Sequence, residues 1–545
     1  MNGKGNNFTT PELTIIFRHL CGHAYNRSPM FHCNRLNDIS YMDMLEETGL
    51  YSPVKEFYEK IVICVTGATG FMGKVLIEKL LRSCPGIPKL YILVREKKGK
   101  DISERFKEQF ADPLYERLRR EQPHFMTKLH FVNGDVGKLR LGLSDEDYNM
   151  IAQEVNIFFH GAATVRFDER LQQAVLVNVR GTREALLLAK KCVNLVAYVH
   201  ISTAYSNCVS KEIDEKFYDP PIEAEKLITL VNTLDEETCH QITPTLLGAF
   251  PNTYAFTKMV GENVVKELSP GLPVVMMRPS IIVSSSKEPV QGWIDNVYGP
   301  TGVIVGAGIG LIRTLHCNKN ILADIIPVDY VINATIVASL PRVENGWEDC
   351  GRQVEERPVP IYNYVSSNER PITWGKTNGR FVPTTFCLWY YCFSLNKHKS
   401  IHTIYMYLLH LLPAHIVDTV LYCIGKKPML VAAYKKVHKF SSVISYFCTQ
   451  QWRFHNDNVK ALSKTLTPGD RALFDFDIAH LNWEEFFYTY IRGIRLYLVK
   501  DTFETIEEGK RKYAWLKLPC FVKLLIFWAA QKVVRRIFSK RKAKN

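Results

Sequence analysis

The chain has 545 residues, of which 46% are hydrophobic and 23% charged, and its formal net charge is +14 at pH 7. This composition excludes a disordered or low-complexity chain, and the length allows several domains. The positive charge favours anionic partners, namely phosphorylated ligands, an anionic membrane face or nucleic acid. None of the fourteen cysteines forms a CxxC pair, so we expect reduced thiols in a cytosol-facing compartment.

The first 51 residues are expected to form an N-terminal extension. Their start, MNGKGNNFTTPELT, is polar and lacks the apolar core of a secretory signal. Histidines and cysteines cluster in the stretch that follows: His19, Cys21, His23, His32 and Cys33. Their spacing matches no common zinc-ligand pattern, so we expect no metal site there.

From residue 60 onward, short β-branched runs alternate with longer amphipathic stretches. The apolar runs are KIVICV (60–65), LYILV (90–94), LHFV (129–132), NIFFH (156–160), VAYVHI (196–201) and PVVMM (273–277). Continuous apolar strands separated by helices are typical of a parallel sheet that is covered on both faces. The sequence therefore predicts an α/β fold with a doubly wound (Rossmann) sheet, whose ligands bind beyond the carboxyl ends of the strands.

The loop TGATGFMG (66–73) follows the first predicted strand and precedes an amphipathic stretch. A Walker A loop is excluded, because Val75 stands where Ser or Thr is required and Ala68 where the first glycine is required. Glycines three residues apart instead indicate a dinucleotide loop, with the pyrophosphate at the helix N-terminus. The expected cofactor-binding residues of this loop are Thr66, Gly67, Thr69, Gly70, Phe71 and Gly73.

The end of the second predicted strand indicates which dinucleotide binds. Arg95 stands where NAD-binding sites commonly have an acidic residue, and a guanidinium suits a 2′-phosphate. This favours NADPH. Asp135 and Val136, after the third strand, are expected near the adenine, and Ala162 in HGAA is expected where the backbone passes the cofactor.

Tyr254 and Lys258 are the candidate catalytic pair, because residues four apart share one face of a helix. A nearby ammonium should lower the pKa of the phenol, which can then exchange a proton with a carbonyl oxygen while hydride moves at carbon. The same ammonium can hydrogen-bond the nicotinamide ribose, so Tyr254 and Lys258 are also expected to bind the cofactor. Ser202 and Thr203 end the fifth predicted strand. Either hydroxyl is a candidate to orient the carbonyl, and the sequence leaves that choice open.

Two C-terminal segments are apolar enough to interact with a membrane. Residues 403–424 contain no Lys or Arg, but two histidines, a proline and Asp418 favour a buried or interfacial helical pair over a span. Residues 506–545 combine an apolar stretch with a final fifteen residues that carry seven Lys or Arg. This tail is expected to bind an anionic membrane surface, the alternative being a solvated basic tail after a core helix.

The motifs TGATGFMG, HGAA, STAY and YAFTK together resemble an extended short-chain dehydrogenase/reductase. More narrowly, the chain resembles the alcohol-forming fatty acyl-CoA reductases, through stretches that include GWIDNVYGPTG (292–302), LLPAHIVD (411–418) and WRFHNDN (452–458). The resemblance covers about residues 52–501. It implies an NADPH-binding reductase domain over 52–380 and a helical C-terminal domain over 381–505.

The family resemblance implies that a long-chain fatty acyl-CoA is reduced to a primary alcohol and CoA, in two hydride transfers from NADPH through an aldehyde. It also implies a membrane location, with the endoplasmic reticulum favoured over the peroxisome. Residues 386–407 are a candidate lining for an acyl channel, with ordinary core packing as an equal alternative. The alternative enzymes are an extended reductase of a sterol, sugar nucleotide or aldehyde, and an aldehyde-forming acyl-CoA reductase. The alternative outside enzymes is an inactive membrane scaffold. No motif supports nucleic-acid binding.

Overall fold

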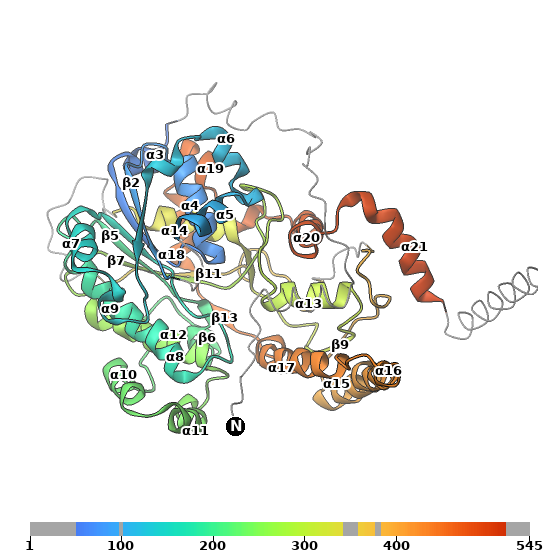
Figure 1. The fold of residues 1–545 in the computed structure, drawn as a ribbon. Coiled ribbons are helices and arrows are strands. Elements are labelled where there is room, and N and C mark those ends of the chain that lie inside the picture. The colour runs from blue at the N-terminus through green and yellow to red at the C-terminus, as the bar shows by residue number, and fades with distance from the viewer. Residues whose placement is uncertain (1–50, 97–101, 342–357, 377–382, 519–545) are drawn as a thin grey trace, which may run out of the picture.

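The computed structural model describes residues 51–96, 102–341, 358–376 and 383–518 (Figure 1). The histidine and cysteine cluster of the N-terminal extension lies outside these ranges. The basic end of the predicted membrane tail lies outside them as well.

A seven-stranded sheet, parallel throughout, forms the centre of the fold, with strand order β11-β7-β5-β4-β1-β2-β3 (Figure 1). The strands are β1 Val62–Thr66, β2 Lys89–Val94, β3 Leu129–Asn133, β4 Ile157–His160, β5 Ala197–Ile201, β7 Val274–Pro279 and β11 Ile361–Tyr364. All six apolar runs are confirmed as strands, and the doubly wound sheet is confirmed with them. β11 was not predicted, because IYNY is short and half polar. The strand order reverses between β1 and β4, where ligands bind in such sheets.

Helices cover both faces of the sheet, as the continuous apolar strands predicted. Side chains alternate along each strand, so Ile63 packs under α4 Phe71–Ser83 and α14 Val328–Ala338, whereas Cys64 packs under α9 Gly181–Ala189. The other helices of this part are α3 Pro53–Phe57, α5 Ile102–Phe110, α6 Glu116–Glu121, α7 Asp145–Glu154, α8 Leu171–Val175, α10 Ala224–Thr233, α11 Glu236–Leu247, α12 Thr253–Leu268 and α13 Gly299–Gly308.

The C-terminal part is mainly helical and returns to the sheet. Its helices are α15 Lys399–Met406, α16 Leu412–Cys423, α17 Leu430–Thr449, α18 Asp457–Lys464, α19 Pro468–Phe474, α20 Trp483–Gly493 and α21 Ile506–Lys517. Of these, α18 and α19 pack on α14, and their side chains Leu462 and Phe474 belong to the same hydrophobic cluster as the strand residue Ile63. One core therefore joins the sheet to the C-terminal helices.

Three small parallel strand pairs lie outside the main sheet. In the first, β8 Ile281–Val283 pairs with β10 Ile325–Pro327. The other two pairs connect the reductase part to the C-terminal part: β9 Thr314–His316 with β12 Ser394–Asn396, and β6 Glu212–Ile213 with β13 Arg453–Phe454.

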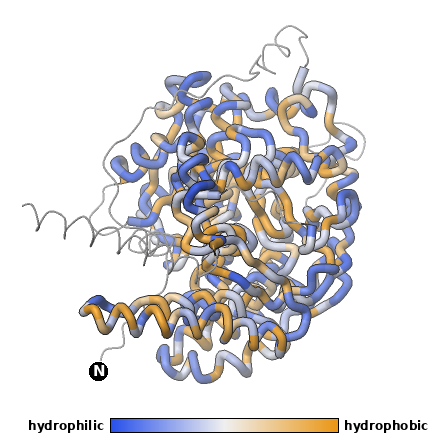
Figure 2. Tube along the Cα trace, turned by 90° about the vertical axis from the view of Figure 1, so that its right-hand side faces the viewer, coloured by the Kyte–Doolittle hydropathy of each residue, from blue (hydrophilic) through white to orange (hydrophobic). Residues whose placement is uncertain are grey.

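Residues Lys399–Cys423 form one continuous helix that runs back along α17 as a hairpin. The predicted helical pair is therefore present. Of the two placements predicted for it, burial is contradicted, because only 17% of the most apolar part of this helix is buried, and the interfacial placement stays a prediction. This helix is the one in the described ranges that is long and apolar enough to cross a bilayer. In Figure 2 it projects as a mostly hydrophobic rod from the lower edge of the molecule.

Gly493 lies where the C-terminal helices meet the reductase part. A Cβ added there would lie 1.8 Å from the carbonyl oxygen of Gly292, itself at φ +72°. Gly493→Ala is therefore expected to lower the free energy of unfolding by at least ~3 kcal/mol, because two backbones must separate. Urea titration measures the effect, and Gly425→Ala is the control. Gly425 follows α16 with φ +74° and nothing within 4 Å, so its replacement should cost only ~1 kcal/mol; equal losses would contradict the clash.

Candidate active site

The glycine loop between β1 and α4 has the geometry of a phosphate cradle. Gly67 has φ +80°, and a Cβ there would lie 2.7 Å from the carbonyl carbon of Gly161. A Cβ on Gly73 would lie 2.2 Å from the oxygen of Gly67, so the first turn of the helix packs directly on the loop. Gly70 is the N-cap of α4, and no side chain caps it. The first N–H groups of the helix therefore face the cavity, as an anion requires.

Thr66 and Ala162 hold the ends of β1 and β4 together. The Thr66 hydroxyl lies 2.9 Å from Nδ1 of His160 and accepts a hydrogen bond from the Ala162 N–H at 3.3 Å. Burial, and then the charge of Lys258, lower the pKa of His160 to about 3. The imidazole is therefore neutral near pH 7, and it helps to hold the strand ends beneath the glycine loop.

Tyr254, Lys258 and Thr203 come together where α12 passes the end of β5. The Lys258 ammonium donates to the carbonyl of Ile201 at 2.8 Å, which fixes the lysine to the strand end. The Thr203 hydroxyl donates to the carbonyl of Pro279 at 3.4 Å and accepts from the N–H of Tyr205 at 3.2 Å, and it lies near enough to the Tyr254 phenol to affect its pKa. Of the two candidate hydroxyls, Ser202 and Thr203, the structure thus places that of Thr203 next to the phenol of Tyr254.

The expectation that Lys258 lowers the pKa of Tyr254 was wrong for this structure. Burial raises the pKa of Tyr254 to about 12, although the Thr203 hydrogen bond opposes the shift. Burial also lowers the pKa of Lys258 to about 8, with Glu262 opposing the shift. At neutral pH the phenol therefore holds its proton, which suits a proton donor in a reduction.

Ser202 is the other candidate hydroxyl, and it belongs to a buried ionic network. It donates to Glu262, and that carboxylate pairs with Arg278 at 2.6 Å. Both charged side chains are almost fully buried, and the guanidinium also donates to the carbonyls of Asp214 and Lys216. Sequence reasoning missed this network, whose only local signal was the Arg within MRPSII.

The predicted adenosine contacts lie at the ends of β2 and β3. Arg95 is exposed just after β2, and the Arg105 guanidinium donates to its carbonyl at 2.6 Å. Arg105 is thus a second cation at this position, and the sequence analysis missed it because it lies ten residues further on, in α5. The Asp135 carboxylate accepts from the N–H of Gly137 at 3.0 Å, and Val136 packs partly buried beside α9.

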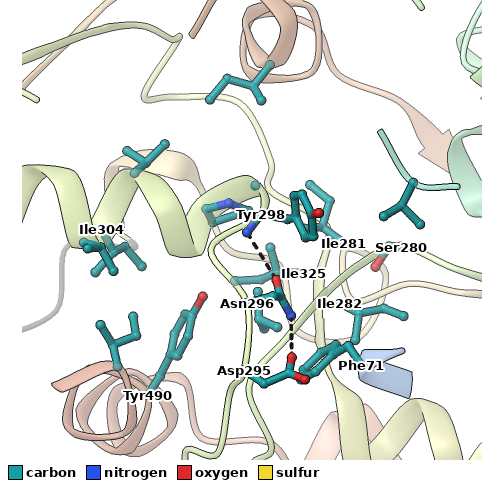
Figure 3. A pocket seen from close by; sticks show the side chains of 18 of the residues that line it. Phe71, Ser280, Ile281, Ile282, Asp295, Asn296, Tyr298, Ile304, Ile325 and Tyr490 are labelled. Carbon is teal, nitrogen blue, oxygen red and sulfur yellow. Dashed lines mark hydrogen bonds between the residues drawn. The ribbon is translucent and has the colours of Figure 1, made fainter. Parts of the chain in front are cut away.

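A cavity of about 860 Å³ connects the glycine loop to the C-terminal helices (Figure 3). The predicted residues that line it are Gly67, Thr69, Gly70, Phe71, Gly73, Ser202, Thr203, Tyr254 and Lys258. Its further walls are largely apolar, and include Ile281, Ile304 and Ile325, which surround it in Figure 3. Tyr391, Phe393 and Leu395 show that the aromatic segment does line the cavity in part.

The C-terminal helices supply walls that sequence reasoning missed. Ile444 and Phe447 come from α17, Phe487 and Tyr490 from α20, and Ile506 from α21. The ring of Phe447 lies 5.5 Å from the ring of Phe167, which in turn lies 5.6 Å from the ring of Tyr254. Apolar side chains therefore lead from the proton donor to α17, and the cavity is shaped to hold a long apolar group beside it.

The residues present fit a nicotinamide dinucleotide. The glycine cradle would be filled by any Cβ at Gly67 or Gly73, and the uncapped helix follows it directly. No group of three or more His, Cys, Asp or Glu side chains in the described ranges could hold a metal ion.

Comparisons with known proteins agree with this arrangement. Two family models, both described as male sterility protein, match residues 65–335 and 409–501. The chain is 40% identical over 504 residues to the fatty acyl-CoA reductase wat of Drosophila melanogaster, covering 91% of this chain and 94% of that protein. It is 36% identical to human fatty acyl-CoA reductase 1, covering 84% and 88%.

A solved structure shows the same fold. The reductase domain of a nonribosomal peptide synthetase from Mycobacterium tuberculosis superposes with a TM-score of 0.52 at 17% identity, over 84% of this chain and 98% of that one. The fold and site thus define a Rossmann-type reductase of the extended short-chain class with a nicotinamide cofactor. Within that class, the chain belongs to the fatty acyl-CoA reductase family.

Proposed function

We propose that the protein reduces a long-chain fatty acyl-CoA to a primary alcohol and CoA, with NADPH as the reductant. The observation that carries this proposal is the single cavity that joins the dinucleotide loop and Tyr254 to apolar walls from α17 and α20. Relatives of known name that are 36–40% identical over most of the chain are called fatty acyl-CoA reductases, which supports the same substrate class.

Each polar side chain of the site has its own role in the proposed reaction. When bound, the cofactor supplies a hydride to the carbonyl carbon, first of the thioester and then of the aldehyde. Thr203 and Tyr254 donate hydrogen bonds to the carbonyl oxygen as negative charge develops on it. Collapse of the first adduct expels CoA thiolate, and in the second reduction Tyr254 gives its proton to the alkoxide. The Lys258 ammonium, held at the end of β5 by the carbonyl of Ile201, would bind the nicotinamide ribose of the cofactor.

Selection of NADPH is assigned to Arg95, just after β2, and to Arg105 of α5, whose guanidinium donates to the Arg95 carbonyl. Replacing both Arg95 and Arg105 with Ser is expected to raise the KM for NADPH at least ~10-fold while the KM for NADH changes little, because charge-assisted bonds to the 2′-phosphate are lost. Steady-state kinetics with both cofactors measures this. Arg120→Ser, an exposed arginine elsewhere, is the control. An equal loss with NADH would contradict the assignment.

The pH dependence of kcat/KM should follow the deprotonation of the Lys258 ammonium. Its pKa is lowered to about 8 by burial, so the charged form is lost as pH rises through that value. We expect kcat/KM for the free enzyme to fall above about pH 8. Lys258→Arg should remove this limb, because a guanidinium stays charged. A wild-type profile that is flat well above pH 8 would show that the ammonium is not needed.

The substrate and the location follow from the same proposal. CoA carries several phosphates, and the exposed Arg492 lines the cavity with its guanidinium bonded to Tyr488 at 2.7 Å. We assign Arg492 to the CoA phosphates. The enzyme is assigned to the cytosolic face of the endoplasmic reticulum, held there in part by the tail from residue 506 onward.

Incubation of the full chain with NADPH and a series of acyl-CoA chain lengths tests the proposal. We expect free thiol and primary alcohol to form together, with two NADPH consumed for each alcohol. Aldehyde as the end product would indicate an aldehyde-forming enzyme. Absence of thiol release at every chain length would overturn the acyl-CoA assignment, and NADPH binding without turnover would indicate an inactive scaffold.

A further inference from the structure

The helical hairpin of α15, α16 and α17 carries an apolar face that nothing in the described chain covers. More than half of the large hydrophobic side chains exposed in the described ranges lie between residues 401 and 424. They include Ile404, Tyr407, Leu408, Leu412, Ile416 and Val420, which are between 53% and 57% exposed. We call residues 401–424 the hairpin face. A contiguous apolar surface of this kind marks an interaction site.

The hairpin is fixed to the rest of the protein, so this exposure is built into the fold. Nε2 of the buried His410 accepts a hydrogen bond from the N–H of Arg313 at 2.9 Å. The phenol of Tyr434 on α17 donates to the carbonyl of Leu311 at 3.0 Å. These contacts leave one side of the long helix against the protein and the other side open.

The charged side chains at the surface of the hairpin are all positive. Residues 399–449 contain six lysines and a single acidic residue, Asp418. Asp418 is buried, and its carboxylate accepts the N–H groups of Met429, Leu430 and Val431, which fixes the turn. Lys439 pairs with Asp168 of the reductase part at 2.7 Å, whereas Lys399, Lys426, Lys427 and Lys435 are exposed on a hairpin whose only acid is buried.

We propose that the hairpin face docks in the plane of an anionic lipid membrane. Apolar side chains would enter the acyl boundary while the lysines contact lipid phosphates, the arrangement of interfacial amphipathic helices. A span is disfavoured, because the hairpin tip carries Lys426 and Lys427 and the paired helix carries further lysines. A second copy is disfavoured as the occupant, since two faces rimmed by lysines repel each other.

Docking through this face would place the cavity beside the membrane. The same helix α17 that carries Lys435 supplies the cavity residues Ile444 and Phe447 at its other end. Lipid-borne apolar groups would then lie close to the cavity wall. The surface is distinct from the tail beyond residue 506, and the assignment does not depend on the acyl-CoA activity, because lipid binding is measured without turnover.

Hydrogen exchange of the full chain, with and without vesicles, tests the proposal. Vesicles of mixed phosphatidylcholine and phosphatidylserine should slow exchange in peptides from the hairpin face and leave α10 and α11 unchanged. Pure phosphatidylcholine should protect much less. Protection confined to the tail would overturn the proposal. So would protection of the hairpin face that depends on protein concentration without vesicles, since a second copy would then be the occupant.

A pair of variants makes the test quantitative. Leu412→Asp with Ile416→Asp should weaken binding to the phosphatidylserine vesicles at least ~10-fold in flotation assays. Leu187→Asp with Val193→Asp is the matched control, since it adds the same charges at exposed aliphatic positions elsewhere. Unaltered thermal unfolding would show that both variants fold. Equal binding by the two double variants would overturn the assignment.

Discussion

Tyr254→Phe is expected to lower kcat for acyl-CoA reduction by ~10²–10⁴-fold while the cofactor still binds with nearly wild-type affinity. The substitution removes one hydroxyl and keeps the ring that packs 5.6 Å from Phe167. Because burial keeps the phenol protonated near neutrality, the group that is lost is the proton donor. Alcohol formation is measured by product analysis, and cofactor binding by fluorescence titration.

Tyr205→Phe is the matched control for this experiment. Tyr205 lines the same cavity, and its ring packs edge-on against Phe447 and Trp452. Removing its hydroxyl makes the same chemical change in the same cavity, but away from Lys258. We expect a change in kcat within a few-fold. If both variants lose activity equally, or if Tyr254→Phe keeps its activity, Tyr254 is not the proton donor.

Features that depend on neighbouring residues could be predicted from the sequence. The buried strands are continuous apolar runs, and the close packing of Gly73 on the carbonyl oxygen of Gly67 lies within the eight residues of the glycine loop. The pairing of Tyr254 with Lys258 depends only on helix periodicity. Each of these features is determined by a short stretch of sequence, so its residue pattern is enough to predict it.

Features that depend on distant residues could not be predicted. The choice between Ser202 and Thr203 depends on Glu262, sixty residues further along, which takes the Ser202 hydroxyl. The raised pKa of Tyr254 results from burial, which a spacing of four residues does not reveal. The apolar pattern of residues 403–424 suits a buried helix and an exposed one equally, and only the packing shows that this helix is exposed.

Arg278→Met is expected to lower the free energy of unfolding by ~3–5 kcal/mol, because it leaves Glu262 charged and buried without its cation. The two side chains are 0% and 2% exposed, and the guanidinium bonds both carboxylate oxygens, at 3.0 and 2.6 Å. Glu262 stands one helical turn beyond Lys258 and also accepts from Ser202. Loss of Arg278 should therefore also displace α12 relative to β5.

The double variant Arg278→Met with Glu262→Leu separates the buried charge from the lost packing. It should recover at least half of the stability, since replacing a buried pair by apolar groups of similar size is often nearly neutral. Urea unfolding gives both values, and the coupling follows from the cycle with Glu262→Leu alone. A double variant no more stable than Arg278→Met would mean that the guanidinium acts chiefly through the carbonyls of Asp214 and Lys216. The network would then anchor the loop before α10 rather than neutralise a charge beneath the catalytic helix.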